Sequence, residues 1–302
     1  MSRKKILILG CSGQVGQSIK KVLKEDYPLD CLDRPSLNFN ELTNLKEKIT
    51  NINPKVIINA AAYTSVDKAE SELKEAFLCN HKGPQFLSKL CFEDNILLIH
   101  FSTDCIFDGN KRESYSENDI SNPLNVYGLS KREGEEEILN SRCKHFIFRT
   151  SWVYGPNREN FLKTILKMAK TNENLRIVND QFGLPTSTDL ISTIVFQFLS
   201  LYFHQEIKKE DYGIYHLAPQ GRASWYEFAC SIVQKASYEG FNIKTKIENV
   251  TPISTSDYSG VATRPKNAVL NNKKLKNFLG IEIYDWKKYL DDTLKQIKMT
   301  SI

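Results

Sequence analysis

Tyr127 and Lys131 are the residues of this sequence whose types and spacing most directly suggest chemistry. They lie in NVYGLSKREGE (residues 125–135), a stretch predicted to be helical, where a separation of four places both side chains on one face. A phenol has a pKa of about 10, and a nearby ammonium group favours the phenolate. Tyr127 could therefore act as a general acid or base. Taken alone, however, a Tyr-x-x-x-Lys pair is better explained by packing on a helix surface.

A second candidate group is the triplet Ser102-Thr103-Asp104 in STDCIFDG (residues 102–109). It directly follows LLIHF, an apolar run typical of a buried strand. What hydroxyl and carboxyl groups do at the end of such a strand depends on the stretches before and after it.

The loop GCSGQVG, after the first apolar run, has glycines at 10, 13 and 16. Between a strand and a helix, this spacing permits a tight turn and brings a pyrophosphate close to the positive end of the helix. A purely structural turn is the alternative, but the position in the first strand-helix unit favours a dinucleotide site. The contacts predicted here are Gly10, Gly13, Gln14, Val15 and Gly16.

Asp33 and Arg34 end the second apolar run, about 20 residues after the glycines, where a ribose-reading residue is expected. The aspartate would bind the 2′-hydroxyl of NAD, and the arginine would favour the 2′-phosphate of NADP, so the cofactor preference stays open. For Arg34 an ordinary solvated turn is an equal alternative.

The segment INAAAYTSVDKAE (residues 58–70) follows the third apolar run. Its small residues would let a ligand approach the edge of the sheet, although close helix-sheet packing would also use them. The cofactor contacts predicted here are Ala60, Ala61, Ala62 and Tyr63.

The elements that must position these groups are short apolar runs alternating with amphipathic segments: KILIL (5–9), PLDCL (28–32), KVIINA (55–60), NILLIHF (95–101) and HFIFRT (145–150). This alternation predicts a Rossmann-like, doubly wound parallel α/β sheet. Later strand candidates are LRIV (175–178) and GIYHL (213–217), and helices are expected at SWYEFACSIVQKA and DWKKYLDDTLKQI. We expect residues 1–150 to form the dinucleotide-binding domain, to which the chain returns at about 187–218, and residues 151–302 to form mainly a smaller substrate-binding lobe.

The composition narrows the class of protein. The net charge of +5 comes from 41 basic and 36 acidic residues without long single-sign runs, so no nucleic-acid partner is expected. The seven cysteines include no CxxC pair and no cluster with metal-ligand spacing, which predicts reduced thiols, a cytoplasmic protein and no metal site. The apolar start is too short for a signal peptide, and IVFQFLSLYF (194–203) is too short for a membrane span.

The Gly-rich first turn, the strand ending in Ser-Thr and the Tyr-x-x-x-Lys pair together resemble the extended short-chain dehydrogenase/reductase superfamily. In that superfamily the hydroxyl residue hydrogen-bonds the reacting oxygen and the tyrosine exchanges the proton. The lysine tunes the tyrosine and holds the nicotinamide ribose. The resemblance implies catalytic roles for Thr103, Tyr127 and Lys131 and cofactor contacts for the last two.

Longer motifs narrow the resemblance to the dTDP-4-dehydrorhamnose reductase family. From about residue 5 to about 290 the chain carries, in the family's order, INAAAYTSVDKAE, STDCIFDG, NVYGLSKREGE, RTSWVYGPNRENFLKTIL, NDQFGLPTSTDL, GIYHLAPQGRASWYEFA and TRPKNAVL. The family reduces the C4 ketone of dTDP-4-dehydro-L-rhamnose with NADPH or NADH, giving dTDP-L-rhamnose for cell-surface polysaccharide. The resemblance therefore implies this activity and a nucleotide-sugar substrate.

Substrate contacts carry over more loosely. The candidates are Thr103, Asp104, Trp152 and Arg264; core packing is the alternative for Trp152, and a structural ion pair is the alternative for Arg264. Gln181 and Thr186 are weaker candidates for the cleft, and Trp225 and Trp286 are expected in the core.

The residue after Asp104 separates a reductase from its relatives. Sugar-nucleotide 4,6-dehydratases of this branch have Thr-Asp-Glu here, because elimination of water needs an extra acid-base pair, whereas this chain has Cys105. A reductase is therefore favoured over a dehydratase. The motifs after residue 149 speak against a C4 epimerase.

Cys105, Asn38 and Ala268 depart from the family pattern, which usually has Tyr, Asp and Ser at these positions. The first lies near the expected sugar, so another nucleotide-linked 4-keto-6-deoxy sugar stays an alternative substrate. A rival of another class is the non-catalytic regulatory subunit of methionine adenosyltransferase, which has the same fold. The retained Thr103, Tyr127 and Lys131 argue for catalysis. The sequence leaves the oligomeric state open, with a homodimer as one option.

Overall fold

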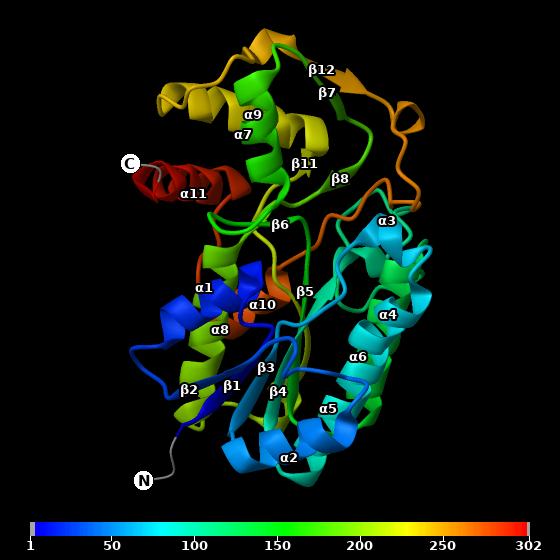
Figure 1. Cartoon of the computed structure of the whole chain (residues 1–302), viewed down its shortest axis with the longest axis vertical. Helices are drawn as coiled ribbons and strands as arrows, with labels where there is room; N and C mark the ends of the chain where they lie inside the picture. Colours follow the sequence, from blue (N-terminus) through cyan, green and yellow to red (C-terminus); the bar gives the residue numbers. More distant parts are fainter. Residues whose placement is uncertain (1–3, 301–302) are drawn as a thin grey trace.

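The computed structural model describes residues 4–300, which form two lobes (Figure 1). The outermost ends of the two predicted domains, residues 1–3 and 301–302, lie outside the described residues. The larger lobe contains a six-stranded parallel sheet in the order β2-β1-β3-β4-β5-β10. Its strands are β1 (Ile6–Leu9), β2 (Leu29–Leu32), β3 (Val56–Asn59), β4 (Leu97–Thr103), β5 (His145–Thr150) and β10 (Gly213–His216).

Both faces of this sheet are covered by helices, as the apolar runs require. Because side chains alternate along a strand, Leu7 and Leu9 of β1 pack on one face while Ile6 and Ile8 pack on the other. The first face is covered by α2 (Leu42–Ile52), α5 (Gly83–Glu93) and α6 (Val126–Asn140). The second is covered by α1 (Gln14–Leu23), α8 (Thr188–Phe203) and α10 (Lys273–Leu279). The predicted doubly wound α/β fold is confirmed.

The strand order places a ligand site. β1 pairs with β2 on one side and with β3 on the other, so the direction of winding reverses there. Open α/β sheets bind ligands beyond the carboxyl ends of their strands at such a switch point. Between β3 and α5 the chain forms α3 (Val66–Ala69), α4 (Leu73–Phe77) and the π-helical turn η1 (Leu78–Lys82).

The smaller lobe has a separate core, formed mainly by α7 (Phe161–Thr171), α9 (Trp225–Tyr238) and α11 (Trp286–Thr300). Three two-stranded pairs accompany these helices: β6 (Val153–Tyr154) with β9 (Thr186–Ser187), β7 (Leu175–Val178) with β12 (Val250–Ile253), and β8 (Phe182–Gly183) with β11 (Ala223–Ser224). Short 3₁₀ turns are η2 (Asp104–Ile106), η3 (Lys209–Asp211), η4 (Ile247–Asn249) and η5 (Thr255–Asp257). Between the elements of this lobe, α8 and β10 return to the large sheet.

No helix within residues 4–300 combines the length and the apolar character needed to cross a membrane.

Candidate active site

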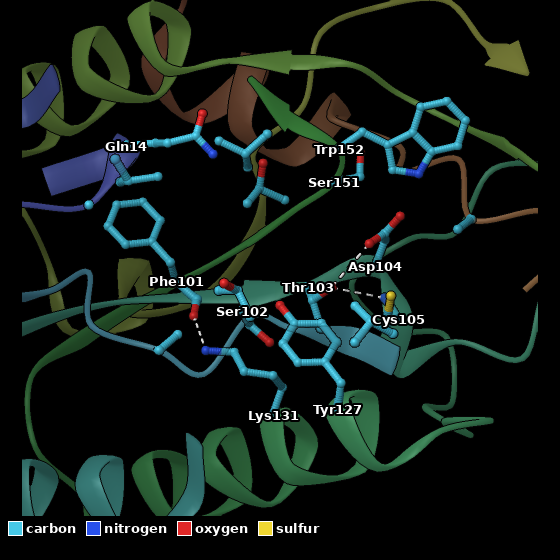
Figure 2. Close-up of a pocket in the computed structure, with 18 of the residues that line it drawn as sticks. Gln14, Phe101, Ser102, Thr103, Asp104, Cys105, Tyr127, Lys131, Ser151 and Trp152 are labelled. Carbon is cyan, nitrogen blue, oxygen red and sulfur yellow. Dashed lines mark hydrogen bonds between the residues drawn. The ribbon is translucent and has the colours of Figure 1, made fainter. Parts of the chain in front are cut away.

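A cavity of about 760 Å³ lies at the carboxyl ends of the strands and is lined by residues from both lobes (Figure 2). It brings together many of the predicted residues, namely Gly13, Gln14, Val15, Ala60, Ala62, Thr103, Asp104, Tyr127, Lys131, Trp152, Gln181 and Arg264. Other predicted residues do not line it: Gly10, Gly16, Asp33, Arg34, Ala61, Tyr63 and Thr186. Thr186 is fully buried, and its hydroxyl donates to Leu184 O instead of facing the cleft (3.1 Å).

Gly10 and Gly16 do not line the cavity but allow the backbone around the loop to pack closely. Gly10 has a φ of +78°, and a Cβ on it would lie 2.7 Å from Ala61 N. A Cβ on Gly16 would lie 2.2 Å from Gly10 O, so the strand, the turn and α1 can approach one another only with glycine here.

The N-terminus of α1 faces the cavity through Gly13, Gln14 and Val15. No side chain caps this end, and its first turn contains no acidic residue. Unpaired N–H groups and the positive end of the helix dipole suit an anion. The loop therefore fits a dinucleotide pyrophosphate.

Asp33 braces this loop from β2. Its carboxylate accepts hydrogen bonds from Ser12 N (2.9 Å) and Cys11 Sγ (2.8 Å). Partial burial would raise the pKa of Asp33, but these hydrogen bonds and the positive charge of Arg158 outweigh it and lower the pKa. The neighbouring Arg34 is exposed and points to Cys79 Sγ, at 3.8 Å.

Close backbone packing positions α6, which carries Tyr127. Asn125 caps the helix by accepting from Gly128 N at 2.8 Å. A Cβ on Gly128 would lie 2.2 Å from Cys105 O, and one on Gly134 would lie 2.0 Å from Asn80 O. The helix can therefore lie directly against the end of β4 and against η1.

The half-buried Tyr127 lies with the buried Thr103 and Asp104 in one polar group. Thr103 Oγ1 accepts from Cys105 N and donates to Asp104 Oδ1, both at 3.1 Å. Burial raises the pKa of the Asp104 carboxyl to about 7. Burial also raises the pKa of the Tyr127 phenol well above its ordinary value, while the hydroxyl of Thr103 acts in the opposite direction. The expectation that the Lys131 ammonium lowers the pKa of Tyr127 is therefore wrong for this structure, because burial dominates the pKa of the phenol.

Lys131 lies 2 % exposed beneath the cavity. Its Nζ donates to Phe101 O at 2.5 Å and lies 3.3 Å from Nε2 of His100, which is held neutral because burial lowers its pKa. Burial lowers the pKa of Lys131 to about 8, while Glu135 opposes the shift. Lys131 is thus mainly charged at neutral pH, and in Figure 2 it rises from the same face of α6 as Tyr127.

The opposite wall comes from the smaller lobe. Trp152 adopts a φ of +45° and stacks on Trp225, with ring centroids 3.5 Å apart. A Cβ on Gly183 would lie 2.6 Å from the Trp152 ring, so this glycine gives the indole its space. Trp225 therefore lines the cavity as well as packing against the core, so the expectation that it lies only in the core is wrong. Trp286 is buried in the core of the smaller lobe, as predicted.

Arg264 lines the same wall and pairs with Asp67 at 2.7 Å. The same aspartate accepts from Val261 N and Ala262 N, so it ties the segment before Arg264 to α3. The hydrogen bond from Arg264 lowers the pKa of Asp67. The ion pair that we weighed against a ligand role is present, at the cavity.

Sequence reasoning missed several lining residues, including Thr150, Ser151, Arg158, Glu159 and Phe182. Thr150 and Ser151 follow β5, and their place after a buried strand could have revealed them. Arg158 had no such signal, because the loop that carries it reaches the cavity only through tertiary packing. Among residues 4–300 no three His, Cys, Asp or Glu side chains form a group that could hold a metal ion.

The fold and the group formed by Tyr127, Lys131 and Thr103 at the cavity place the chain in the extended short-chain dehydrogenase/reductase class. Comparisons with known proteins are more specific. Residues 4–299 match the family model described as RmlD substrate binding domain. The dTDP-4-dehydrorhamnose reductase of Aggregatibacter actinomycetemcomitans is 39% identical over 95% of this chain and 97% of its own length.

Solved structures agree. A dTDP-4-dehydrorhamnose reductase of Clostridium acetobutylicum is 34% identical with a TM-score of 0.89, covering 98% of this chain and 100% of that one. The enzyme of Bacillus anthracis, in complex with NADP, is 31% identical with a TM-score of 0.88, covering 97% and 99%. The chain belongs to the dTDP-4-dehydrorhamnose reductase family.

Proposed function

We propose that this chain reduces the C4 ketone of dTDP-4-dehydro-L-rhamnose to dTDP-L-rhamnose, with NADPH or NADH as the reductant, in the cytoplasm. The observation that carries the proposal is the convergence of Thr103, Tyr127 and Lys131 on a cavity that also contains the uncapped N-terminus of α1. Family membership supports the substrate.

We assign the binding of the two ligands to the two lobes. Residues 1–150, together with the returning segment at about 187–218, would hold the dinucleotide, with its pyrophosphate on Gly13, Gln14 and Val15. The lobe of residues 151–302 would hold the sugar nucleotide, with Trp152 against the deoxyhexose and Arg264 on the diphosphate.

A nicotinamide held at this site would supply the hydride for the carbonyl carbon. Tyr127 donates its phenolic proton to the carbonyl oxygen, so the ketone becomes an alcohol and the tyrosine becomes a phenolate. Because burial raises the pKa of Tyr127, the acid is fully protonated at neutral pH before the reaction. Solvent later returns the proton.

Thr103 stabilises the developing negative charge with a hydrogen bond. In the structure its hydroxyl donates to Asp104 Oδ1 (3.1 Å), so this proton must turn toward the sugar. Asp104 helps, because with a pKa of about 7 it can hold a proton of its own and donate to Thr103 Oγ1. Lys131 would hold the ribose and stabilise the phenolate through its positive charge.

The test follows oxidation of NADPH and NADH by the loss of the reduced nicotinamide's absorbance. It uses freshly generated dTDP-4-dehydro-L-rhamnose and, in parallel, other nucleotide-linked 4-keto-6-deoxy sugars. The proposal predicts fastest turnover with the dTDP-rhamnose precursor. Turnover only with another sugar would change the substrate. Cofactor binding without turnover of any sugar would favour the non-catalytic regulatory-subunit alternative. Sedimentation of the same protein would test the homodimer.

A further inference from the structure

The loop between β6 and α7 crosses from the smaller lobe onto the glycine-rich loop. Arg158 Nε donates to Ser12 O, and Asn160 Nδ2 donates to Gln14 Oε1, both at 2.9 Å. Arg158 is exposed and lines the rim of the cavity. A cation from the sugar side of the molecule is thus attached to the loop that we assign to the dinucleotide.

The conformation of Arg158 is unusual for its residue type. Its φ of +61° lies in the left-handed region, which favours glycine and is unfavourable for other residues. Within residues 4–300 its guanidinium forms no ion pair, and its two terminal nitrogens donate no hydrogen bond to protein. The strained backbone therefore presents a cation whose terminal donors remain available.

Asp33 indicates where the adenosine ribose of a bound dinucleotide would lie relative to the Arg158 guanidinium. In a dinucleotide fold the acidic residue at the end of the second strand marks the 2′ position of the adenosine ribose. Here both donors to Asp33 come from the loop, Cys11 Sγ and Ser12 N, and Arg158 is bonded to the carbonyl of that same Ser12. The positive charge of Arg158 is felt at the Asp33 carboxylate, which agrees with this proximity.

We propose that Arg158 binds the 2′-phosphate of NADPH and makes NADPH the preferred reductant; this inference rests on the proposed function. A 2′-phosphate beside the Asp33 carboxylate needs a neutralising charge, and the two terminal nitrogens of Arg158 are free to donate to it. Arg34, the residue that the sequence suggested for this phosphate, points instead to Cys79.

The experiment is calorimetric titration with 2′,5′-ADP and with 5′-AMP, which differ by the 2′-phosphate. Arg158→Gln should raise the Kd for 2′,5′-ADP about tenfold, because one charge-assisted contact is lost, and should change the Kd for 5′-AMP less than about twofold. Arg158→Lys should recover part of the loss. Arg142 is an exposed arginine with a similar φ of +62°, in the turn after α6, so Arg142→Gln is the matched control for removing an arginine from this conformation.

The outcomes separate the inference from the function on which it rests. If Arg158→Gln weakens the binding of both nucleotides equally, or of neither, the inference is wrong but the dinucleotide site is not contradicted. If only Arg34→Gln discriminates between the probes, Arg34 is the phosphate ligand and the inference is wrong. If the unaltered protein binds neither probe, both the inference and the proposed function fail. In the reductase assay, Arg158→Gln should lower the ratio of kcat/KM for NADPH to that for NADH about tenfold.

Discussion

The two walls of the cavity hold their functional side chains in different ways. On the wall formed by β4 and α6, Thr103, Asp104 and Lys131 are 5%, 4% and 2% exposed and come from regular elements. On the wall of the smaller lobe, Arg158 and Arg264 come from loops and remain exposed or half-buried. The first wall has raised or lowered pKa values caused by burial, whereas the second presents charges close to solvent.

This difference suggests a division of labour. Proton transfer needs groups fixed to within a fraction of an ångström, which a packed helix and strand provide. Recognition of a charged ligand tolerates more movement and uses loops. Changes to the first wall should therefore lower kcat or stability, and changes to the second should mainly raise KM or Kd.

The largest effect is expected for Tyr127→Phe, which removes the proposed proton donor and keeps the ring. We expect kcat to fall about 10²–10⁴-fold, while the Kd for NADPH, measured by fluorescence quenching, stays within about twofold. Tyr238→Phe, at a tyrosine that is 90% exposed, is the matched control. Full activity of the Tyr127 variant would remove it as the acid.

The next effect concerns the support of α6. Glu135 pairs with Arg149 of β5 at 2.7 Å, and both side chains are buried. Glu135→Ala leaves a buried guanidinium without its partner, so the free energy of unfolding in urea should fall by about 3–5 kcal/mol. Glu136, exposed and paired with Arg132 at 3.2 Å, is the control, and Glu136→Ala should cost less than about 0.5 kcal/mol. Equal losses would mean that the buried pair does not hold the helix.

A smaller effect should depend on pH. The pKa of Asp104 is about 7 in the folded chain, against 3.8 ordinarily, so between these values the folded state binds more protons than the unfolded state. Stability from this group is therefore lost as pH rises from about 4 to about 7. The change in the free energy of unfolding caused by Asp104→Asn is compared at two pH values. It should be more stabilising at pH 8 than at pH 4.5 by on the order of 2 kcal/mol. Parallel pH profiles for the two proteins would show that Asp104 titrates normally.

The smallest effect tests the loop wall. Arg264→Gln should raise KM for the sugar nucleotide about tenfold and change kcat less than about twofold, because the proposed contact with the diphosphate would bind substrate and transition state alike. Inhibition by dTDP should weaken in parallel. A fall in kcat with unchanged KM would group Arg264 with the residues of β4 and α6. It would contradict the division of labour between the two walls.

The sequence predicted the first wall well and the second poorly, for physical reasons. The helical spacing of Tyr127 and Lys131 and the position of Thr103 after an apolar strand are local patterns, and the structure brings all three to the cavity. The five apolar runs likewise predicted five strands of the large sheet, and the later candidate GIYHL contains the sixth, β10. Periodicity and strand ends are properties of short segments, so they can be read without tertiary knowledge.

Contacts that depend on tertiary packing were not predictable in this way. Arg158 reaches the glycine-rich loop across a separation of 146 residues, and Trp225 lines the cavity because it stacks on Trp152. Thr186 occurs in a motif that resembles the family but lies fully buried. The pKa of Tyr127 also depends on how completely α6 and β4 exclude water, which residue spacing does not reveal.

The most direct measurement uses NADPH carrying deuterium at C4 of the nicotinamide, with dTDP-4-dehydro-L-rhamnose and the unaltered chain. The account predicts dTDP-L-rhamnose with one deuterium at C4 of the sugar, located by NMR and counted by mass spectrometry. Unlabelled product, or deuterium at another carbon, would contradict direct hydride transfer to the C4 ketone. No product from a folded, cofactor-binding protein would contradict reduction of this sugar.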